Sequence, residues 1–136
     1  MELEAQLASV PLLAGLDAKV RRRLAKIGKR RTYAAGETIV EEGATAIALY
    51  VVLRGRVRVE RAGAPVGALR AGDFFGELAL IEDEPRSASV IAVKETECLL
   101  FLAWEFRSLL DEHPQIAAPI MRALIERLHR QEHHGS

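Results

Sequence analysis

Residues 48–60 read ALYVVLRGRVRVE, and this stretch decides the fold class. Ala48–Leu53 is apolar at every position, which is typical of a strand that is covered on both faces. Arg56–Glu60 alternates charged and apolar residues, which is typical of a strand with one face in water. Arg54 and Gly55 between them match a two-residue hairpin loop, in which the glycine can adopt a positive φ. The stretch therefore predicts a β-hairpin.

Short strands continue on both sides of this hairpin, and glycines separate them. The predicted strands are Arg31–Tyr33, Thr38–Val40, Ala48–Leu53, Arg56–Arg61, Val66–Leu69, Asp73–Phe75, Ser87–Val93 and Thr96–Leu102. The predicted turn glycines are Gly36, Gly43, Gly55, Gly63, Gly67 and Gly72. Strands at this spacing predict a mainly β fold with flanking helices, either a sandwich or a barrel, and the simplest choice is an eight-stranded jelly-roll β-barrel (double-stranded β-helix).

Helices are expected before and after the strands, within a single domain. Asp17 is suited to cap a helix that carries Val20 and Leu24 on one face and ends at Gly28. After the strands the helical spacing returns, and Pro114 is placed to open the last helix. Within one domain, residues 1–136, the predicted order is N-terminal helices over residues 1–30, a β-roll over residues 31–102 and C-terminal helices over residues 103–132.

The last helical stretch contains Pro119, which removes a hydrogen bond inside a helix. Either the helix bends at Pro119, or its regular portion begins close to this residue. Ile116, Ile120, Leu124 and Leu128 repeat every four residues, and this stripe is either domain core or a dimer seam.

The composition excludes several classes of protein. The 136 residues include 19 Lys and Arg and 19 Asp and Glu, so a nucleic-acid binder with a wholly basic surface is not expected. The single Cys98 has no disulfide partner and is expected to be a small buried hydrophobe. The longest apolar runs, Ala46–Leu53 and Cys98–Trp104, fall far short of the roughly 20 residues of a membrane helix. We therefore expect a cytoplasmic protein with no membrane span.

One region is strongly basic, because no acidic residue lies between Asp17 and Glu37. The cations are Lys19, Arg21, Arg22, Arg23, Lys26, Lys29, Arg30 and Arg31. A run of this kind is more often a solvated face or a contact to an acidic partner than a phosphate site. Nucleic acid is therefore not an expected partner of this chain.

The segment FGELALIEDEPRSASV at residues 75–90 carries the chemistry. Gly76 lets the backbone approach a ligand closely, and a helical turn after it would direct free amide groups at an anion. Arg86 offers a planar set of donors suited to phosphate, with the hydroxyls of Ser87 and Ser89 beside it. Glu77 would repel phosphate but can accept hydrogen bonds from a sugar hydroxyl. An anion site beside a hydroxyl acceptor fits a nucleotide.

At these residues the sequence resembles the cyclic nucleotide-binding domain family, of the catabolite activator protein and cyclic AMP-dependent kinase regulatory subunit type. The family's phosphate-binding cassette reads F-G-E-[L/I]-[A/S]-L, a short variable stretch and then R-[S/T/A]-A, and residues 75–88 match it throughout. The resemblance extends from about Leu12 to Leu128. It implies that the ligand is cyclic AMP, with cyclic GMP as the alternative.

The resemblance also implies roles for individual residues. Glu77 is expected to bind the ribose 2′-hydroxyl, and Arg86 is expected to bind the exocyclic oxygens of the cyclic phosphate. Other residues expected to complete the cassette are Gly76, Leu78, Ala79, Ser87 and Ala88. Inward-pointing walls for the base are expected from Val59 and Val66, and contacts from a lid are expected from Arg127, Leu128 and Gln131. Gln131 is suited to bind an adenine amino group.

One position departs from the family pattern. Many members carry an acidic residue two positions before the Leu49-Tyr50 pair, and in some it pairs with the cassette arginine; here the residue is Ile47. The resemblance therefore implies phosphate binding by Arg86 without that acidic partner.

Catalysis is not expected. A metalloenzyme with jelly-roll architecture needs histidines on neighbouring strands, and residues 31–102 contain none. His129 and His133 share a helix face but lie outside the strands, where a polar tail is the simpler interpretation. We therefore expect no catalytic residue, no metal and no cofactor other than the nucleotide ligand.

These patterns predict a sensor domain that binds a cyclic nucleotide and signals by movement of its C-terminal helices. The expected partners are the nucleotide and either an effector protein or a second copy, through the C-terminal helix. The alternatives are a sensor fragment of a larger transcription regulator, ion channel or kinase, or a degenerate domain that serves only as an interaction module.

Overall fold

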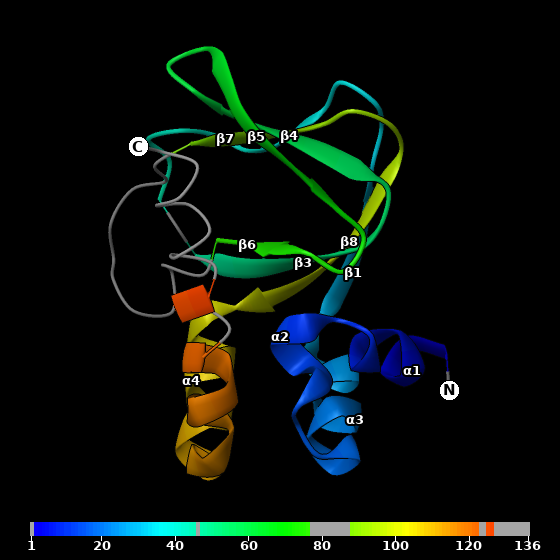
Figure 1. Cartoon of the computed structure of the whole chain (residues 1–136), viewed down its shortest axis with the longest axis vertical. Coiled ribbons are helices and arrows are strands. Elements are labelled where there is room, and N and C mark those ends of the chain that lie inside the picture. Colours follow the sequence, from blue (N-terminus) through cyan, green and yellow to red (C-terminus); the bar gives the residue numbers. More distant parts are fainter. Residues whose placement is uncertain (1, 46, 77–87, 123–124, 127–136) are drawn as a thin grey trace. The chain divides into compact units, whose positions relative to one another are not determined.

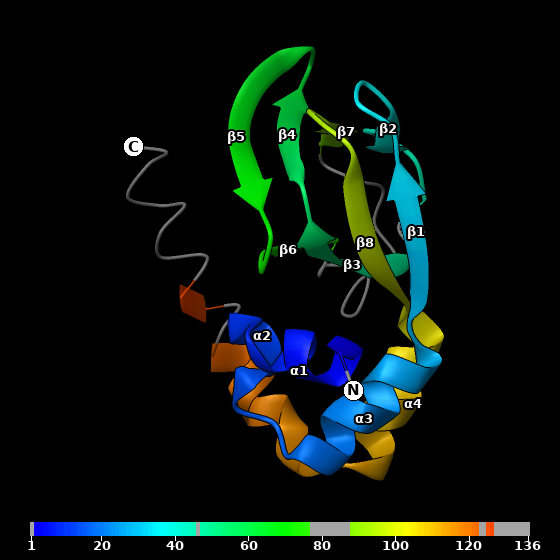
Figure 2. The same cartoon turned by 90° about the vertical axis from the view of Figure 1, so that its right-hand side faces the viewer.

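The computed structural model describes residues 2–45, 47–76, 88–122 and 125–126 of the chain. The chain forms two compact units. One unit, residues 27–106, contains the strands, and the other, residues 1–26 with 107–136, contains helices joined by short turns in its described residues (Figures 1 and 2). The single domain over residues 1–136 stays a prediction.

The β unit is built from two antiparallel sheets. The strands are β1 Lys29–Tyr33, β2 Thr38–Val40, β3 Ala48–Arg54, β4 Arg56–Arg61, β5 Ala64–Arg70, β6 Phe74–Phe75, β7 Ser89–Ala92 and β8 Thr96–Leu102. One four-stranded sheet has the order β1-β8-β3-β6 and the other has the order β2-β7-β4-β5 (Figure 2). Both sheets combine strands that lie far apart in the sequence, so the predicted jelly-roll fold is confirmed.

Most strand limits agree with the sequence prediction, and the differences have local causes. β1 begins two positions earlier than expected, because Lys29 already pairs with Leu100 directly after the helix ends. β6 begins only at Phe74, because the preceding Asp73 closes a turn by accepting the Arg70 N–H at 3.0 Å. Gly67 was predicted to be a turn residue, and this prediction is wrong: it lies inside β5, paired with Val59.

The strand β3 is buried on both faces, as its apolar sequence predicts. Ala48, Tyr50 and Val52 belong to the cluster between the sheets. Leu49, Val51 and Leu53, on the opposite face, are no more than 6% exposed. β3 also lies between β8 and β6, so it is an interior strand that is hydrogen-bonded to a neighbour on each side.

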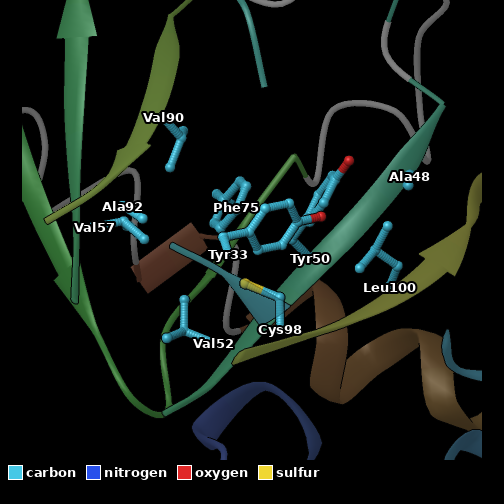
Figure 3. Close-up of a cluster of buried hydrophobic side chains, with 10 residues drawn as sticks. All are labelled: Tyr33, Ala48, Tyr50, Val52, Val57, Phe75, Val90, Ala92, Cys98 and Leu100. Carbon is cyan, nitrogen blue, oxygen red and sulfur yellow. The ribbon is translucent and has the colours of Figure 1, made fainter. Parts of the chain in front are cut away.

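The core between the sheets contains side chains from both of them (Figure 3). β1, β3, β6 and β8 contribute Tyr33, Ala48, Tyr50, Val52, Phe75, Cys98 and Leu100, whereas β4 and β7 contribute Val57, Val90 and Ala92. Cys98 is fully buried, which confirms its prediction as a small hydrophobe. Burial raises the pKa of the Cys98 thiol to about 12, and the nearby Glu97 adds to this shift.

The N-terminal helices are α1 Glu2–Ala8, α2 Pro11–Ala14 and α3 Ala18–Ile27. α3 begins after Asp17 and ends before Gly28, as predicted, with Val20 and Leu24 buried. Gly28 is also required sterically, because a Cβ there would lie 2.7 Å from Cγ of Leu99. The start and stop signals in the sequence therefore mark both ends of α3.

The C-terminal region contains α4 Ala103–Glu112, the 3₁₀ turn η2 Pro114–Ile116 and helical residues 117–122 and 125–126. Pro114 opens η2 rather than an α-helix, because the Ile116 N–H bonds to the His113 carbonyl oxygen in a short turn. Pro119 lies in the first turn of the helix that begins at residue 117, where a missing N–H costs little. The regular helix thus begins close to Pro119, one of the two arrangements expected.

No helix within the described residues is long and apolar enough to cross a membrane.

Candidate functional site

The segment predicted to bind the ligand connects the two sheets. It follows β6, which pairs with β3, and it precedes β7, which pairs with β4 and β2. Both ends of the segment are therefore attached to strands of the core.

The first end of the segment is well defined at Phe75 and Gly76. Phe75 is 4% exposed and stacks on Tyr50, with 4.7 Å between ring centroids and 8° between ring planes (Figure 3). Gly76 follows with a φ of +83°, a conformation that side chains disfavour. The packed aromatic pair thus holds the strand in place directly before a glycine with a positive φ.

The second end is Ala88, which precedes β7. The Oγ atom of Ser89 accepts a hydrogen bond from the Glu42 N–H at 2.9 Å, and Ser89 pairs with Glu60 of β4. The sequence suggested the Ser89 hydroxyl as a phosphate donor. In the structure its oxygen connects β7 to the turn after β2, which leaves the O–H group as a donor, so the suggested role stays a prediction.

The central cassette residues lie outside the described residues: Glu77, Leu78, Ala79, Arg86 and Ser87. The lid residues Arg127, Leu128 and Gln131 also lie outside them. The ligand-binding roles of all these residues, and those of Gly76 and Ala88, stay predictions.

The predicted base wall consists of one packed residue and one exposed residue. Val59 packs against the core cluster and pairs with Gly67 on β5 and Val90 on β7. The β4–β5 register shifts between Val59 and Glu60, so that Val66 is the extra residue of a β-bulge. Val66 is 54% exposed and is not packed against the core cluster. Because of the bulge, Val66 does not follow the regular alternation of side chains between the two faces of a strand. Its role as a base wall stays a prediction.

Gly67 is a feature of this wall that the sequence prediction missed. Among the described residues of the chain, no atom lies within 4 Å of the position that a Cβ at Gly67 would occupy. The glycine therefore leaves open space beside Val59. The sequence could have revealed this role of Gly67 only through its pairing with Val59 across the hairpin. The bulge shifts the register by one residue, and the sequence pattern does not show that shift.

Two tyrosines bring polar groups into the apolar core. Burial raises the pKa of Tyr33 to about 12, with additional contributions from Tyr50 and Cys98. The Tyr33 hydroxyl therefore stays protonated to a higher pH than an ordinary tyrosine, and it can act as a hydrogen-bond donor or acceptor.

The chain matches the sequence profile of the cyclic nucleotide-binding domain over residues 30–113. It belongs to the cyclic nucleotide-binding domain family.

Relatives of the chain include a kinase regulatory subunit and a channel. The chain is 45% identical over 91 residues to a cAMP-dependent protein kinase regulatory subunit of Aspergillus fumigatus, covering 65% of this chain and 22% of that protein. It is 36% identical over 120 residues to a cyclic nucleotide-gated potassium channel of Rhizobium etli, covering 88% of this chain and 34% of the channel. The chain therefore spans about a third or less of the length of these two relatives.

A solved structure of the family supports the same fold. The catabolite activator protein of Thermus thermophilus matches with a TM-score of 0.80 and 31% sequence identity, over 90% of this chain and 60% of that one. This chain and the Thermus thermophilus protein are thus similar both in sequence and in their fold.

The departure from the family pattern at Ile47 is visible in the structure. Ile47 is 59% exposed, and its carbonyl oxygen accepts a hydrogen bond from the Ala103 N–H at 2.9 Å. The side chain at this position is thus apolar and solvent-accessible, and the residue contributes to the fold through its backbone.

Metal binding has no support among the described residues, where no three His, Cys, Asp or Glu side chains gather as a set of ligands. The histidines that share a helix face in the sequence, His129 and His133, lie outside the described residues.

Proposed function

We propose that this chain binds a cyclic nucleotide, with cyclic AMP as the preferred ligand and cyclic GMP as the alternative. The observation that carries the proposal is the complete cassette pattern at residues 75–88, located in the connection between β6 and β7 of a jelly roll. The Aspergillus fumigatus relative, which is named as cAMP-dependent, supports the choice of ligand.

The expected affinity is moderate. A cyclic nucleotide has about 22 non-hydrogen atoms, and about 0.3 kcal/mol for each gives about 7 kcal/mol. This free energy corresponds to a dissociation constant of about 10 µM.

We further propose a regulatory role rather than a catalytic one. Ligand binding to the cassette would change the position of the C-terminal helices, and an effector or a second copy would detect the change. Two relatives are a kinase regulatory subunit and a channel, which supports a role for the chain as the cytoplasmic sensor of a kinase, a channel or a transcription regulator.

Titration calorimetry with cyclic AMP and cyclic GMP tests the proposal on the parent chain and on Arg86→Ala. Loss of charge-assisted contacts of about 1.5–3 kcal/mol should weaken binding by about 10- to 150-fold. Arg22→Ala is the matched control, because Arg22 is an exposed arginine on α3. It should bind like the parent chain.

Two results would contradict the proposal. The first is a parent chain that binds neither nucleotide, which would favour a degenerate domain that serves only as an interaction module. The second is an Arg86→Ala variant with unchanged affinity.

A further inference from the structure

Three chain reversals meet at one end of the β unit. They are the β3–β4 turn at Gly55, the β5–β6 turn at residues 71–73 and the β7–β8 turn at residues 93–95. Arg56 pairs directly with Arg70, which joins the first two turns. The Val93 N–H bonds to the Arg56 carbonyl oxygen at 2.9 Å, which joins the third.

Hydrogen bonds of Thr96 and Asp73 hold this end of the unit together. Thr96 is 1% exposed, and its Oγ1 accepts the Arg56 N–H at 3.3 Å and lies 3.1 Å from the Arg56 carbonyl oxygen and 2.8 Å from that of Lys94. On the other side, Asp73 accepts the Arg70 N–H, and the Gly72 N–H bonds to the Val52 carbonyl oxygen at 2.8 Å. The backbones that carry the side chains of this end are therefore fixed.

The side chains displayed from this rigid end are mainly cationic. The exposed cations, here called the turn cations, are Arg54, Arg56, Arg70 and Lys94. None of them forms an ion pair with another described residue. By contrast, Arg58 on the same strand as Arg56 pairs with Glu60 at 2.6 Å.

The acidic groups nearby offset only part of this charge. Asp73 stays a carboxylate while it accepts the Arg70 N–H. Glu97, which lies opposite Arg54 in the β3–β8 register, forms an ion pair with Arg30 at 3.2 Å. Glu95 is exposed on the β7–β8 turn. The surface therefore keeps an excess of positive charge.

The placement of Arg56 opposite Arg70 disfavours folding, because like charges directly across an antiparallel pair repel one another. Nothing in the core requires arginine at either position, since both residues are exposed. Each guanidinium group can donate two parallel hydrogen bonds to one carboxylate. Two arginines on paired strand positions are therefore suited to bind two carboxylates.

We propose that the turn cations form a docking surface for an acidic segment of a protein partner. The turn cations lie outside residues 75–88 in the sequence, and the proposal does not rest on nucleotide binding. An acidic peptide is favoured over nucleic acid, because the chain has a formal net charge of zero and lacks the wholly basic composition of a dedicated nucleic-acid binder.

The test uses the whole chain labelled with nitrogen-15 and a deca-glutamate peptide as the probe, at low salt. The amide signals of residues 54–56, 70–73 and 93–96 should shift on titration, and added salt should reverse the shifts. Shifts confined to other regions of the chain would overturn the proposal.

Arg56→Glu is the informative variant, because it removes one cation and places an opposite charge beside Arg70. Binding of the peptide should weaken by about tenfold or more. The melting temperature should not fall, since a repulsive pair becomes an attractive one. Arg56→Gln is a second variant that should also weaken binding without introducing a new charge.

Arg22→Glu is the matched control, because it changes the net charge equally on exposed α3 surface. Equal weakening by Arg22→Glu and Arg56→Glu would show a general charge effect and overturn the proposal. A short DNA duplex and phosphatidylserine vesicles are the comparison probes. If either shifts the same signals at lower concentration than the peptide, the surface recognises phosphate and the proposed protein partner is wrong.

Discussion

At the residue scale, Gly55 shows how one position satisfies two demands. Its φ is +108°, which L-residues other than glycine rarely adopt. A Cβ at this position would also lie 2.5 Å from Oγ1 of Thr96 and 2.7 Å from the Glu95 carbonyl oxygen. Glycine is therefore required both for the turn and for its close approach to the neighbouring turn.

Gly55→Ala should destabilise the chain more than Gly63→Ala. Both glycines have positive φ, but a Cβ at Gly63 meets no described atom within 4 Å. The Gly63 substitution should cost about 1 kcal/mol through its backbone conformation, and the Gly55 substitution should cost at least about 2 kcal/mol more through steric overlap. Urea unfolding of the two variants measures this difference, and equal free energies of unfolding would contradict the close approach.

At the element scale, the connection between β6 and β7 depends on the strands that flank it. β6 is only the two residues Phe74–Phe75, and both are buried. Such a short strand is held mainly by side-chain packing, above all by Phe75 on Tyr50. The glycine that follows then begins the segment expected to bind phosphate.

The C-terminal helices should become more protected when the nucleotide binds. Hydrogen exchange of residues 114–131 is expected to slow on addition of cyclic AMP, because ligand binding shifts the population of helix positions. The amides of β3 should not change, since this strand is already buried on both faces. Unchanged exchange in residues 114–131 of a chain that binds the nucleotide would rule out the proposed signalling movement. Arg86→Ala at the same nucleotide concentration serves as the control.

At the scale of the whole molecule, the core places two ionisable groups in an apolar region. The pKa of Tyr33 is raised from 10.0 to about 12 and that of Cys98 from 9.0 to about 12, in both cases mainly by burial. On unfolding, both groups return to water and ionise at lower pH. Between about pH 9 and 12 the unfolded chain therefore binds fewer protons than the folded chain.

The free energy of unfolding should consequently fall as pH rises through this range, and these two groups should have no effect below about pH 8. Urea unfolding at about pH 8 and about pH 11 measures the change. Cys98→Ala and Tyr33→Phe should each reduce the loss of stability between the two conditions. A loss that is the same in both variants as in the parent chain would contradict the assignment to these groups.

The sequence alone determined the features that depend on neighbouring residues. Alternation and apolar runs predicted eight strands, because the period of two is a local property of each strand. Asp17 and Gly28 marked the ends of α3, and Gly55 marked a hairpin turn, because helix boundaries and positive φ depend on single positions. The cassette pattern at residues 75–88 pointed to the family in the same way.

Only the tertiary structure decided which distant residues meet. The bulge at Val66 moves the β4–β5 register by one residue, so that Gly67 rather than Val66 pairs with Val59. The pairing of Arg56 with Arg70, and the hydrogen bond from Arg56 to Thr96, also depend on strand register. Register results from the packing of the whole core and from bulges within it, and local sequence periodicity does not contain that information.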